Sequence, residues 1–291
     1  MDSYAVSRVA IQGEAGAFSH EAARRLFGAE VELVACPTFE ALFAAVEDGT
    51  AGRGMVPVEN TLAGAVQRPM DLLLTADVRA VAETRVPIRL CLASTPGRSL
   101  EQVSSAASHP VALQQCHGFF EAHPWIAREV SYDTAGSIKD LMEGRASYDA
   151  GIGSELAAEL YAATVLARGI EDDAENHTRF LAIARMQEAI AQIRDGVAAS
   201  ADDALKTSVA FTVPHVPGAL HRALGCFAER AVDLSRVESR PVRGRPWEYR
   251  FYADLRGAPP ELQDEALEAL RTLGCAVHVI GRYVEEPLRG A

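Results

Sequence analysis

The chain has 291 residues, 48% hydrophobic and 23% charged, which is the composition of a soluble globular protein of about two domains. Its formal net charge of −12 argues against nucleic acid and anionic membranes as partners, because both attract clustered Lys and Arg. No apolar run approaches the ~20 residues that span a bilayer, and the first residues do not open a signal peptide. We therefore expect a cytoplasmic protein.

The cysteines and lysines restrict the chemistry further. The five cysteines are scattered and odd in number, which is typical of a reduced compartment and predicts neither a disulfide framework nor a zinc site. Lys139 and Lys206 are the only lysines, so few residues could form a Schiff base with a cofactor.

The chain begins with a strand, a glycine loop and a helix. Residues 8–11 are an apolar strand, residues 13–16 form the loop, and Ser19 is the expected N-cap of a helix that ends at Gly28. The free N–H groups at such a helix N-terminus can bind an anion. Glu14 would repel a phosphate, however, so a tight turn is an equal alternative.

A later strand carries the first site candidates. Residues 54–58 form a buried strand that ends in Glu59 and Asn60. In open α/β sheets, ligands bind beyond the carboxyl ends of strands, which makes both side chains candidates. The alternative is that Asn60 or Thr61 caps a helix over residues 66–74.

The α/β alternation continues and predicts largely parallel sheets in two lobes, the second at about 86–165. Ser108 opens a helix that carries Gln115. These side chains are either a cap and a solvated amide, or two donors that face a carboxylate. Asp133 and Thr134 cap the next helix. The further elements are strands at 31–36, 87–93, 103–107, 128–132, 148–152 and 164–166, and a helix at 38–47.

Residues 176–180 carry the second group of candidates, at the entry of a buried strand over 181–184. Arg179 offers a planar clamp for a carboxylate, and the hydroxyl of Thr178 can donate or accept a hydrogen bond. The alternative is a strand start at which Arg179 pairs with the acidic stretch 171–175.

After an expected linker at 186–205, the pattern predicts a compact βαββαβ unit, which is a ferredoxin-like order. Its expected strands are 207–213, 232–239, 247–255 and 275–280, and its expected helices are 219–230 and 261–273.

Six stretches of this sequence, in order and at the family's spacing, resemble the prephenate dehydratase family with its ACT domain. Those that resemble the catalytic part are GMVPVEN (54–60), SHPVALQQC (108–116), DTA (133–135) and NHTRF (176–180). Those that resemble the ACT regulatory domain are HVPGAL (215–220) and ESRP (238–241).

The resemblance implies a two-lobed catalytic part at 6–185, similar to type II periplasmic binding proteins, and an ACT domain at 206–284. The site would lie in the cleft between the lobes. No N-terminal chorismate mutase helix domain, which some relatives carry, is expected, because the first strand begins by residue 8. The residues that match the family's site are Asn60, Ser108, Gln115, Thr134, Thr178 and Arg179, with Phe180 and Glu59 in the substrate pocket.

The resemblance also implies a reaction, the conversion of prephenate to phenylpyruvate with loss of CO2 and water in phenylalanine biosynthesis. This chemistry needs no cofactor and no metal. We expect Arg179 to bind a carboxylate and Thr178 to contact the departing hydroxyl. A threonine is too weak an acid to complete the proton transfer alone, and Glu59 and His109 are the nearby titratable candidates.

The ACT resemblance implies feedback inhibition by phenylalanine and a homodimer or homotetramer that forms through this domain. The alternative for this domain is a plain dimerisation module in which Gly218 is an ordinary turn. Two alternatives stay open. An arogenate dehydratase performs the same chemistry on a substrate with an amine in place of the ketone, and a non-catalytic sensor would bind an aromatic or amino acid. The expected effector residues are Pro217, Gly218, Ala219, Leu220, Glu238, Ser239, Arg240 and Pro241.

Overall fold

The computed structural model describes residues 8–189, 205–242, 244 and 247–286, and its helices and strands alternate as predicted. The helices are α1 (Phe18–Phe27), α2 (Phe39–Glu47), α3 (Gln67–Leu72), α4 (Pro110–Gln114), α5 (His117–Ala122), α6 (Thr134–Met142), α7 (Glu155–Leu160), α9 (Ala219–Ala228) and α10 (Pro260–Thr272). The strands are β1 (Arg8–Gln12), β2 (Glu32–Cys36), β3 (Arg53–Asn60), β4 (Gly64–Ala65), β5 (Val78–Pro87), β6 (Cys91–Ser94), β7 (Ser105–Ser108), β8 (Ala127–Val130), β9 (Ala150–Gly153), β10 (Thr164–Arg168), β11 (His177–Arg185), β12 (Leu205–Thr212), β13 (Asp233–Pro241), β14 (Tyr249–Arg256) and β15 (Ala276–Val284).

The chain divides into two compact units. Unit 1 comprises residues 1–70 and 84–182, and unit 2 comprises residues 71–83 and 183–291. The segment 71–83, which was predicted to belong to the catalytic part at 6–185, therefore packs with unit 2. Most of the expected linker at 186–205 lies outside the described residues.

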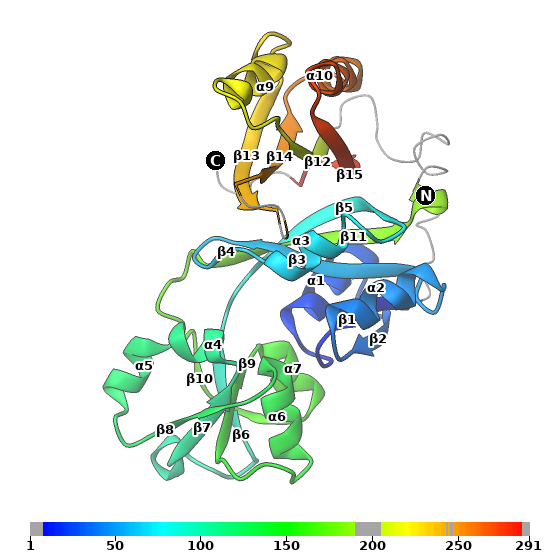
Figure 1. The fold of residues 1–291 in the computed structure, drawn as a ribbon. Coiled ribbons are helices and arrows are strands. Elements are labelled where there is room, and N and C mark those ends of the chain that lie inside the picture. Colours follow the sequence, from blue (N-terminus) through cyan, green and yellow to red (C-terminus); the bar gives the residue numbers. More distant parts are fainter. Residues whose placement is uncertain (1–7, 190–204, 243, 245–246, 287–291) are drawn as a thin grey trace. The chain divides into compact units, whose positions relative to one another are not determined.

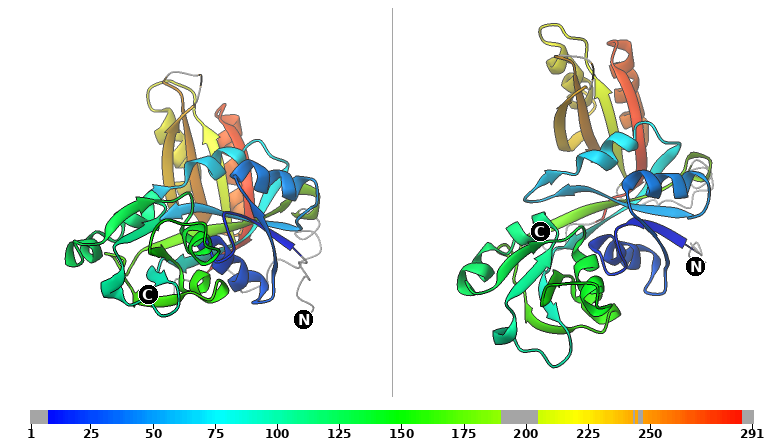
Figure 2. Two further views of the ribbon diagram at one scale, coloured as in Figure 1. Left: turned by 90° about the horizontal axis from the view of Figure 1, so that it is seen from below. Right: turned by 60° about the horizontal axis from the view of Figure 1, so that its bottom comes forward.

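Unit 1 has two lobes, and each is built on its own sheet (Figures 1 and 2). The first sheet has the order β11-β3-β1-β2, with β1 parallel to both β2 and β3. The second has the order β10-β6-β9-β7-β8. It is mixed, because β7 is parallel to β8 and β9 whereas β6 is antiparallel to β9 and β10. The second lobe is the green part of Figure 1, where α4 and α5 lie on one side of its sheet and α6 and α7 on the other.

The helix caps of unit 1 confirm the prediction for Asp133 and add two more. The side chains of Thr38, Asp133 and Ser154 each accept a hydrogen bond from the backbone N–H three residues later, which satisfies an otherwise unpaired donor of the helix. The prediction for Ser19 is wrong. Ala17 occupies the N-cap of α1, and the hydroxyl of Ser19 instead donates to the carbonyl oxygen of Gln12 at 3.3 Å.

Three element boundaries differ from the prediction. The expected strand over 87–93 is two strands, since β5 ends at Pro87 and β6 begins at Cys91. The helix expected after Ser108 breaks after Gln114 into α4 and α5. Strand β11 already begins at His177, so the motif 176–180 lies largely inside a strand and not in the loop before it.

Unit 2 contains the predicted βαββαβ order. Its four strands form an antiparallel sheet, β13-β14-β12-β15, which is the ferredoxin-like arrangement. Helices α9 and α10 bury one face of this sheet, with Phe211, Phe227 and Phe251 in the core between them. β15 also meets β5 in parallel register at Gly281 and Ala80, both within unit 2.

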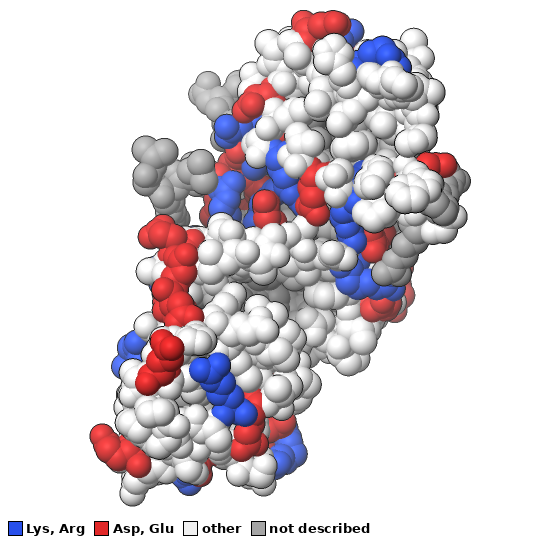
Figure 3. Space-filling view, turned by 60° about the vertical axis from the view of Figure 1, so that its left-hand side comes forward, with Lys and Arg blue, Asp and Glu red and all other residues white. Residues whose placement is uncertain are grey.

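On the face drawn in Figure 3, Arg and Lys side chains are interspersed with Asp and Glu. The ion pairs of unit 2 include Arg256 with Asp233 at 2.8 Å and Arg282 with Asp264 at 2.6 Å. Within the described part of the chain, every helix is too short or too polar to cross a membrane.

Candidate active site

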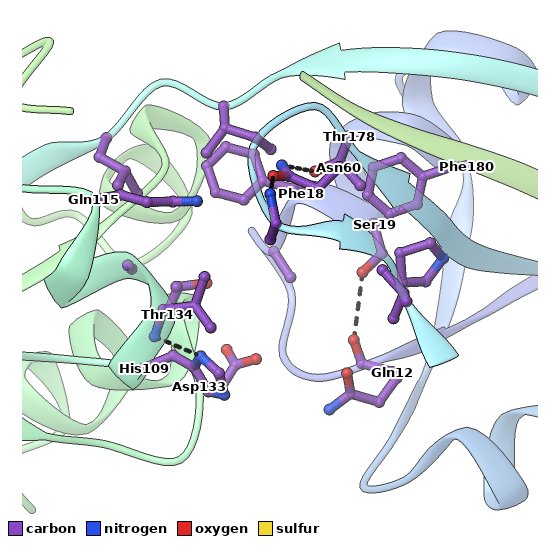
Figure 4. A pocket seen from close by; sticks show the side chains of 18 of the residues that line it. Gln12, Phe18, Ser19, Asn60, His109, Gln115, Asp133, Thr134, Thr178 and Phe180 are labelled. Carbon is purple, nitrogen blue, oxygen red and sulfur yellow. Dashed lines mark hydrogen bonds between the residues drawn. The ribbon is translucent and has the colours of Figure 1, made fainter. Parts of the chain in front are cut away.

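A cavity of about 310 Å³ lies in unit 1, lined by residues of both lobes (Figure 4). Its polar lining residues are Gln12, Ser19, Asn60 and Thr178 from the first lobe, and His109, Gln115, Asp133 and Thr134 from the second. Four of the predicted site residues, together with the expected wall residue Phe180, thus come to one place. Three others, Ser108, Arg179 and Glu59, do not line this cavity.

Thr178 is near the start of β11, and Asn60 is the last residue of the neighbouring strand β3. The side-chain nitrogen of Asn60 donates to the hydroxyl oxygen of Thr178 at 3.0 Å. The nitrogen of an amide can only donate, so the oxygen of Thr178 must accept. Among the described residues no acceptor is bonded to the hydroxyl hydrogen of Thr178, which can therefore donate into the cavity.

The remaining hydrogen bonds of Asn60 fix its orientation. Its side-chain oxygen accepts from the backbone N–H groups of Leu62 and Ala63, at 3.0 and 2.8 Å. Its nitrogen also contacts the side-chain oxygen of Asn176 at 2.7 Å. Asn60 therefore caps the turn after β3, and α3 begins only at Gln67, so the alternative that Asn60 caps this helix is wrong.

Arg179 lies on the other side of β11, which corrects the expectation that it clamps a substrate carboxylate in the pocket. Successive side chains of a strand point to opposite faces, so Thr178 and Phe180 share the cavity side and Arg179 does not. The Arg179 side chain is 7% exposed, and its guanidinium lies 3.6 Å from the carboxylate of Glu59. The two residues form an ion pair that does not line the cavity.

Ser108 is a structural residue of the second lobe. It is fully buried, and its hydroxyl donates to the carbonyl oxygen of Ile152 in the neighbouring strand β9 at 2.7 Å. The next residue, His109, lines the cavity and caps α4, because its Nδ1 accepts from the backbone N–H of Val111 at 3.3 Å.

Gln115 and Thr134 supply the spare donors of the second lobe. Gln115 ends α4, and its amide points into the cavity, whereas Thr134 is the first residue of α6 (Figure 4). Neither side chain is hydrogen-bonded to any residue that the structure describes. Both can therefore bind a ligand at no cost to the fold.

The sequence analysis missed Gln12, Phe18 and Asp133 as cavity residues and gave Ser19 a different role. The pattern that could have found the first-lobe residues is the strand, loop and helix at residues 8–28, because the first turn of α1 lines the cavity. Its N–H groups and the helix dipole favour an anion there. This matters because the described lining residues include no Arg or Lys.

Asp133 is the one carboxylate among the described lining residues. Burial raises the pKa of this side chain, the nearby carboxylate of Glu14 acts in the same direction, and the N–H of Gly136 and His109 oppose the shift. The described residues contain no group of three or more His, Cys, Asp or Glu side chains that could hold a metal.

Unit 2 has its own cavity of about 420 Å³, at the start of α9 and of β14. The predicted effector residues Pro217, Gly218, Ala219 and Leu220 line it, together with Trp247. The other predicted stretch, 238–241, does not line this cavity. Gly218 has φ of 76°, a left-handed conformation that glycine adopts without strain.

The fold agrees with the comparison to known proteins. The sequence pattern of the prephenate dehydratase family matches residues 9–188. The chain is 34% identical to arogenate dehydratase/prephenate dehydratase 2 of Arabidopsis thaliana, over 95% of this chain and 72% of that one. It is 35% identical to the bifunctional chorismate mutase/prephenate dehydratase of Aquifex aeolicus, over 95% and 73% of the two chains.

Solved structures extend the similarity to the entire fold. The prephenate dehydratase of Arthrobacter aurescens, solved in complex with L-Phe, is 30% identical, with a TM-score of 0.83 over 98% of this chain and 93% of that one. GqqA, described as a novel type of quorum quenching acylase, is 32% identical, with a TM-score of 0.83 over 97% and 99%. Since the family pattern covers both lobes of unit 1 and the residues of their shared cavity, the chain belongs to the prephenate dehydratase family.

Proposed function

We propose that this dehydratase converts prephenate to phenylpyruvate, with loss of CO2 and water, and that it needs neither cofactor nor metal. The observation that carries this proposal is the hydrogen bond from Asn60 to Thr178. It leaves the hydroxyl hydrogen of Thr178 as a donor that faces the cavity, at the position where a leaving hydroxyl needs one.

The substrate fits the cavity with its two ends on opposite sides. In prephenate, the hydroxyl is across the ring from the carbon that bears a carboxylate and the pyruvyl side chain. Figure 4 shows Thr178 and Asn60 across the cavity from Asp133 and Thr134. Thr178 therefore meets the departing hydroxyl, and the acidic side chain of the substrate lies near the first turn of α6.

Neutral donors and helix N-termini then bind the carboxylates. The first turn of α1 and the spare groups of Gln115 and Thr134 supply N–H and O–H donors. The carboxylate that leaves as CO2 lies against the apolar part of the lining, which includes Phe18, Ile88 and Leu90. Scarce water there favours the dispersal of its charge. The ring becomes aromatic as CO2 and water leave, and this supplies the driving force.

Proton transfer to the leaving group needs a stronger acid than a threonine hydroxyl. Of the two titratable candidates named from the sequence, His109 lines the cavity and Glu59 does not. Thr178 thus orients the hydroxyl, and His109 is the candidate source of the proton.

We further propose that phenylalanine inhibits by binding in the cavity of unit 2, which acts as an ACT regulatory domain. The L-Phe complex of the Arthrobacter aurescens relative supports this. The second effector stretch is tied to the segment 71–83, since the guanidinium of Arg240 lies 3.2 Å from the carboxylate of Asp71. Pairing of two βαββαβ sheets would give the homodimer or homotetramer and bring residues 238–241 of one copy to the effector cavity of another.

One experiment tests the dehydratase proposal. Ultraviolet absorbance of phenylpyruvate is followed with prephenate as substrate, with and without phenylalanine, before and after dialysis against a chelator. We expect turnover that phenylalanine inhibits and that dialysis leaves unchanged. Binding of prephenate without turnover would favour the sensor alternative, and loss of activity on dialysis would contradict the metal-free mechanism.

The acylase relative raises acyl transfer as another reaction, which would need a nucleophile activated by a base. Among the described lining residues, no hydroxyl is hydrogen-bonded to His109 or Asp133. Ser19 donates to a backbone carbonyl, and Thr178 accepts from an amide. These contacts favour dehydration.

A further inference from the structure

The cavity contains one carboxylate that the dehydration itself does not use. Asp133 lines it, and the other lining residues that the structure describes include no Arg and no Lys. Prephenate and arogenate differ at one position of the side chain, a keto oxygen in the first and an ammonium group in the second. A carboxylate at that position repels the electron-rich keto oxygen and attracts the ammonium.

Asp133 is held in place before any ligand arrives. One side-chain oxygen accepts from the backbone N–H of Gly136 at 2.8 Å. The other lies against Gly13, where an added Cβ would come within 2.6 Å of it and would displace this carboxylate. A group fixed in this way loses little entropy when it binds a cation.

The neighbour of Asp133 completes an amino-acid site. The ammonium and carboxylate of an amino acid are on the same carbon, so their partners must be adjacent. Thr134 follows Asp133 directly and offers an unbonded hydroxyl at the N-terminal turn of α6. The ring of the substrate then points across the cavity toward Thr178 (Figure 4).

We propose that Asp133 is a specificity-determining residue that binds the ammonium group of arogenate, so that the site turns over arogenate as well as prephenate. This inference rests on the proposed dehydratase function. Thr134 holds the adjacent carboxylate, and Thr178 meets the hydroxyl of both substrates.

The charge of Asp133 makes this preference depend on pH. Burial raises the pKa of Asp133, Glu14 adds to the shift, and His109 opposes it. Glu14 is itself paired with Lys139 at 2.7 Å. Only the ionised carboxylate attracts an ammonium group, so the preference for arogenate rises as the pH increases through the pKa of Asp133.

The test compares kcat/KM for arogenate and for prephenate in the parent, in Asp133→Asn and in Asp140→Asn. Asparagine keeps the oxygen that caps α6, so the first variant loses the charge alone. Asp140 is on the same helix, pairs with Arg145 and does not line the cavity, which makes it the matched control. We expect Asp133→Asn to lower kcat/KM for arogenate by about 10- to 100-fold and to change that for prephenate by less than about threefold.

Each other outcome has a defined meaning. An equal loss with both substrates, or an arogenate preference that keeps its pH dependence in Asp133→Asn, overturns the role of Asp133. A parent that uses prephenate but not arogenate overturns this inference and leaves the proposed function intact. A parent that turns over neither substrate overturns both.

Discussion

The side-chain nitrogen of Asn60 lies 3.0 Å from the hydroxyl oxygen of Thr178, and these residues are 118 positions apart in the chain. The contact makes Thr178 an acceptor toward Asn60 and a donor toward the cavity. We therefore expect Thr178→Ala to lower kcat by about 10²- to 10³-fold with little change in KM, because the lost contact is made chiefly in the transition state. Steady-state kinetics with prephenate measure both constants.

The matched control is Thr178→Ser, which keeps a hydroxyl at this position and should retain most of the activity. Asn60→Ala should lower kcat as well, because it frees the hydroxyl of Thr178 to turn away. Parent-like turnover by Thr178→Ala would show that the departing hydroxyl is bound elsewhere.

Arg179 should matter for stability more than for substrate binding. Its side chain is buried and faces the partly exposed Glu59, so Arg179→Met removes the ion pair and the packing of a buried guanidinium. We expect a lower melting temperature and a change in KM of less than about threefold, which corresponds to under ~1 kcal/mol of binding. A large rise in KM at unchanged melting temperature would mean that Arg179 reaches the substrate.

Gly218→Val should abolish inhibition by phenylalanine. Valine is strained at the positive φ of this position, and its side chain would fill the approach to the start of α9. Calorimetry of phenylalanine binding and inhibition assays measure the effect. Gly257→Val is the control, since Gly257 also has a positive φ but does not line the effector cavity. Equal loss in both variants would point to general unfolding of unit 2.

Glu21 should make stability fall as the pH rises. Burial raises its pKa from 4.5 to about 7, partly offset by a hydrogen bond with Ser154. Between these values the folded state binds more protons than the unfolded state, so the free energy of unfolding decreases with increasing pH. His20 acts in the opposite sense, because burial lowers its pKa from 6.5 to about 4.

The variant Glu21→Gln isolates the first effect. Relative to the parent, it should gain stability from about pH 4.5 to pH 7, by up to about 2 kcal/mol after allowance for partial solvent contact. Urea denaturation at several pH values measures the difference. The exposed Glu159→Gln serves as control, and a difference that does not change with pH would contradict the assignment.

Lys206 is one of two lysines in the chain and is 2% exposed in unit 2. Its amine lies 2.8 Å from the carboxylate of Glu83 and 3.1 Å from that of Glu285. Lys206→Met removes this cation from the buried Glu83, while Glu285 keeps Arg256 at 3.4 Å, and we expect a cost of about 3–5 kcal/mol of stability. The double variant with Glu83→Gln should recover part of the loss in a denaturation experiment. A single variant as stable as the parent would show that water solvates the acids.

Local chemistry explains which parts of the fold were predictable. The caps at Thr38, Asp133 and Ser154 each join a side chain to the backbone N–H three residues later. Both groups lie in one short stretch of sequence, so such caps can be predicted without the tertiary structure. Ser19 was misassigned because the helix begins at Phe18 with Ala17 at its N-cap, and the presence of one serine does not reveal where the first turn starts. The long strand β5 was missed because its residues 78–87 carry charged side chains inside a buried strand.

The sequence by itself determined the βαββαβ order of the second part and the nearness of Asn60 and Thr178 to a site. It did so because strand and helix periodicity and polar residues at strand ends are local features. Only the tertiary structure decided that Arg179 faces Glu59 and that Asp133 joins the cavity. The side of a strand that meets the cavity depends on its register with distant strands, and a shift of one residue exchanges its two faces.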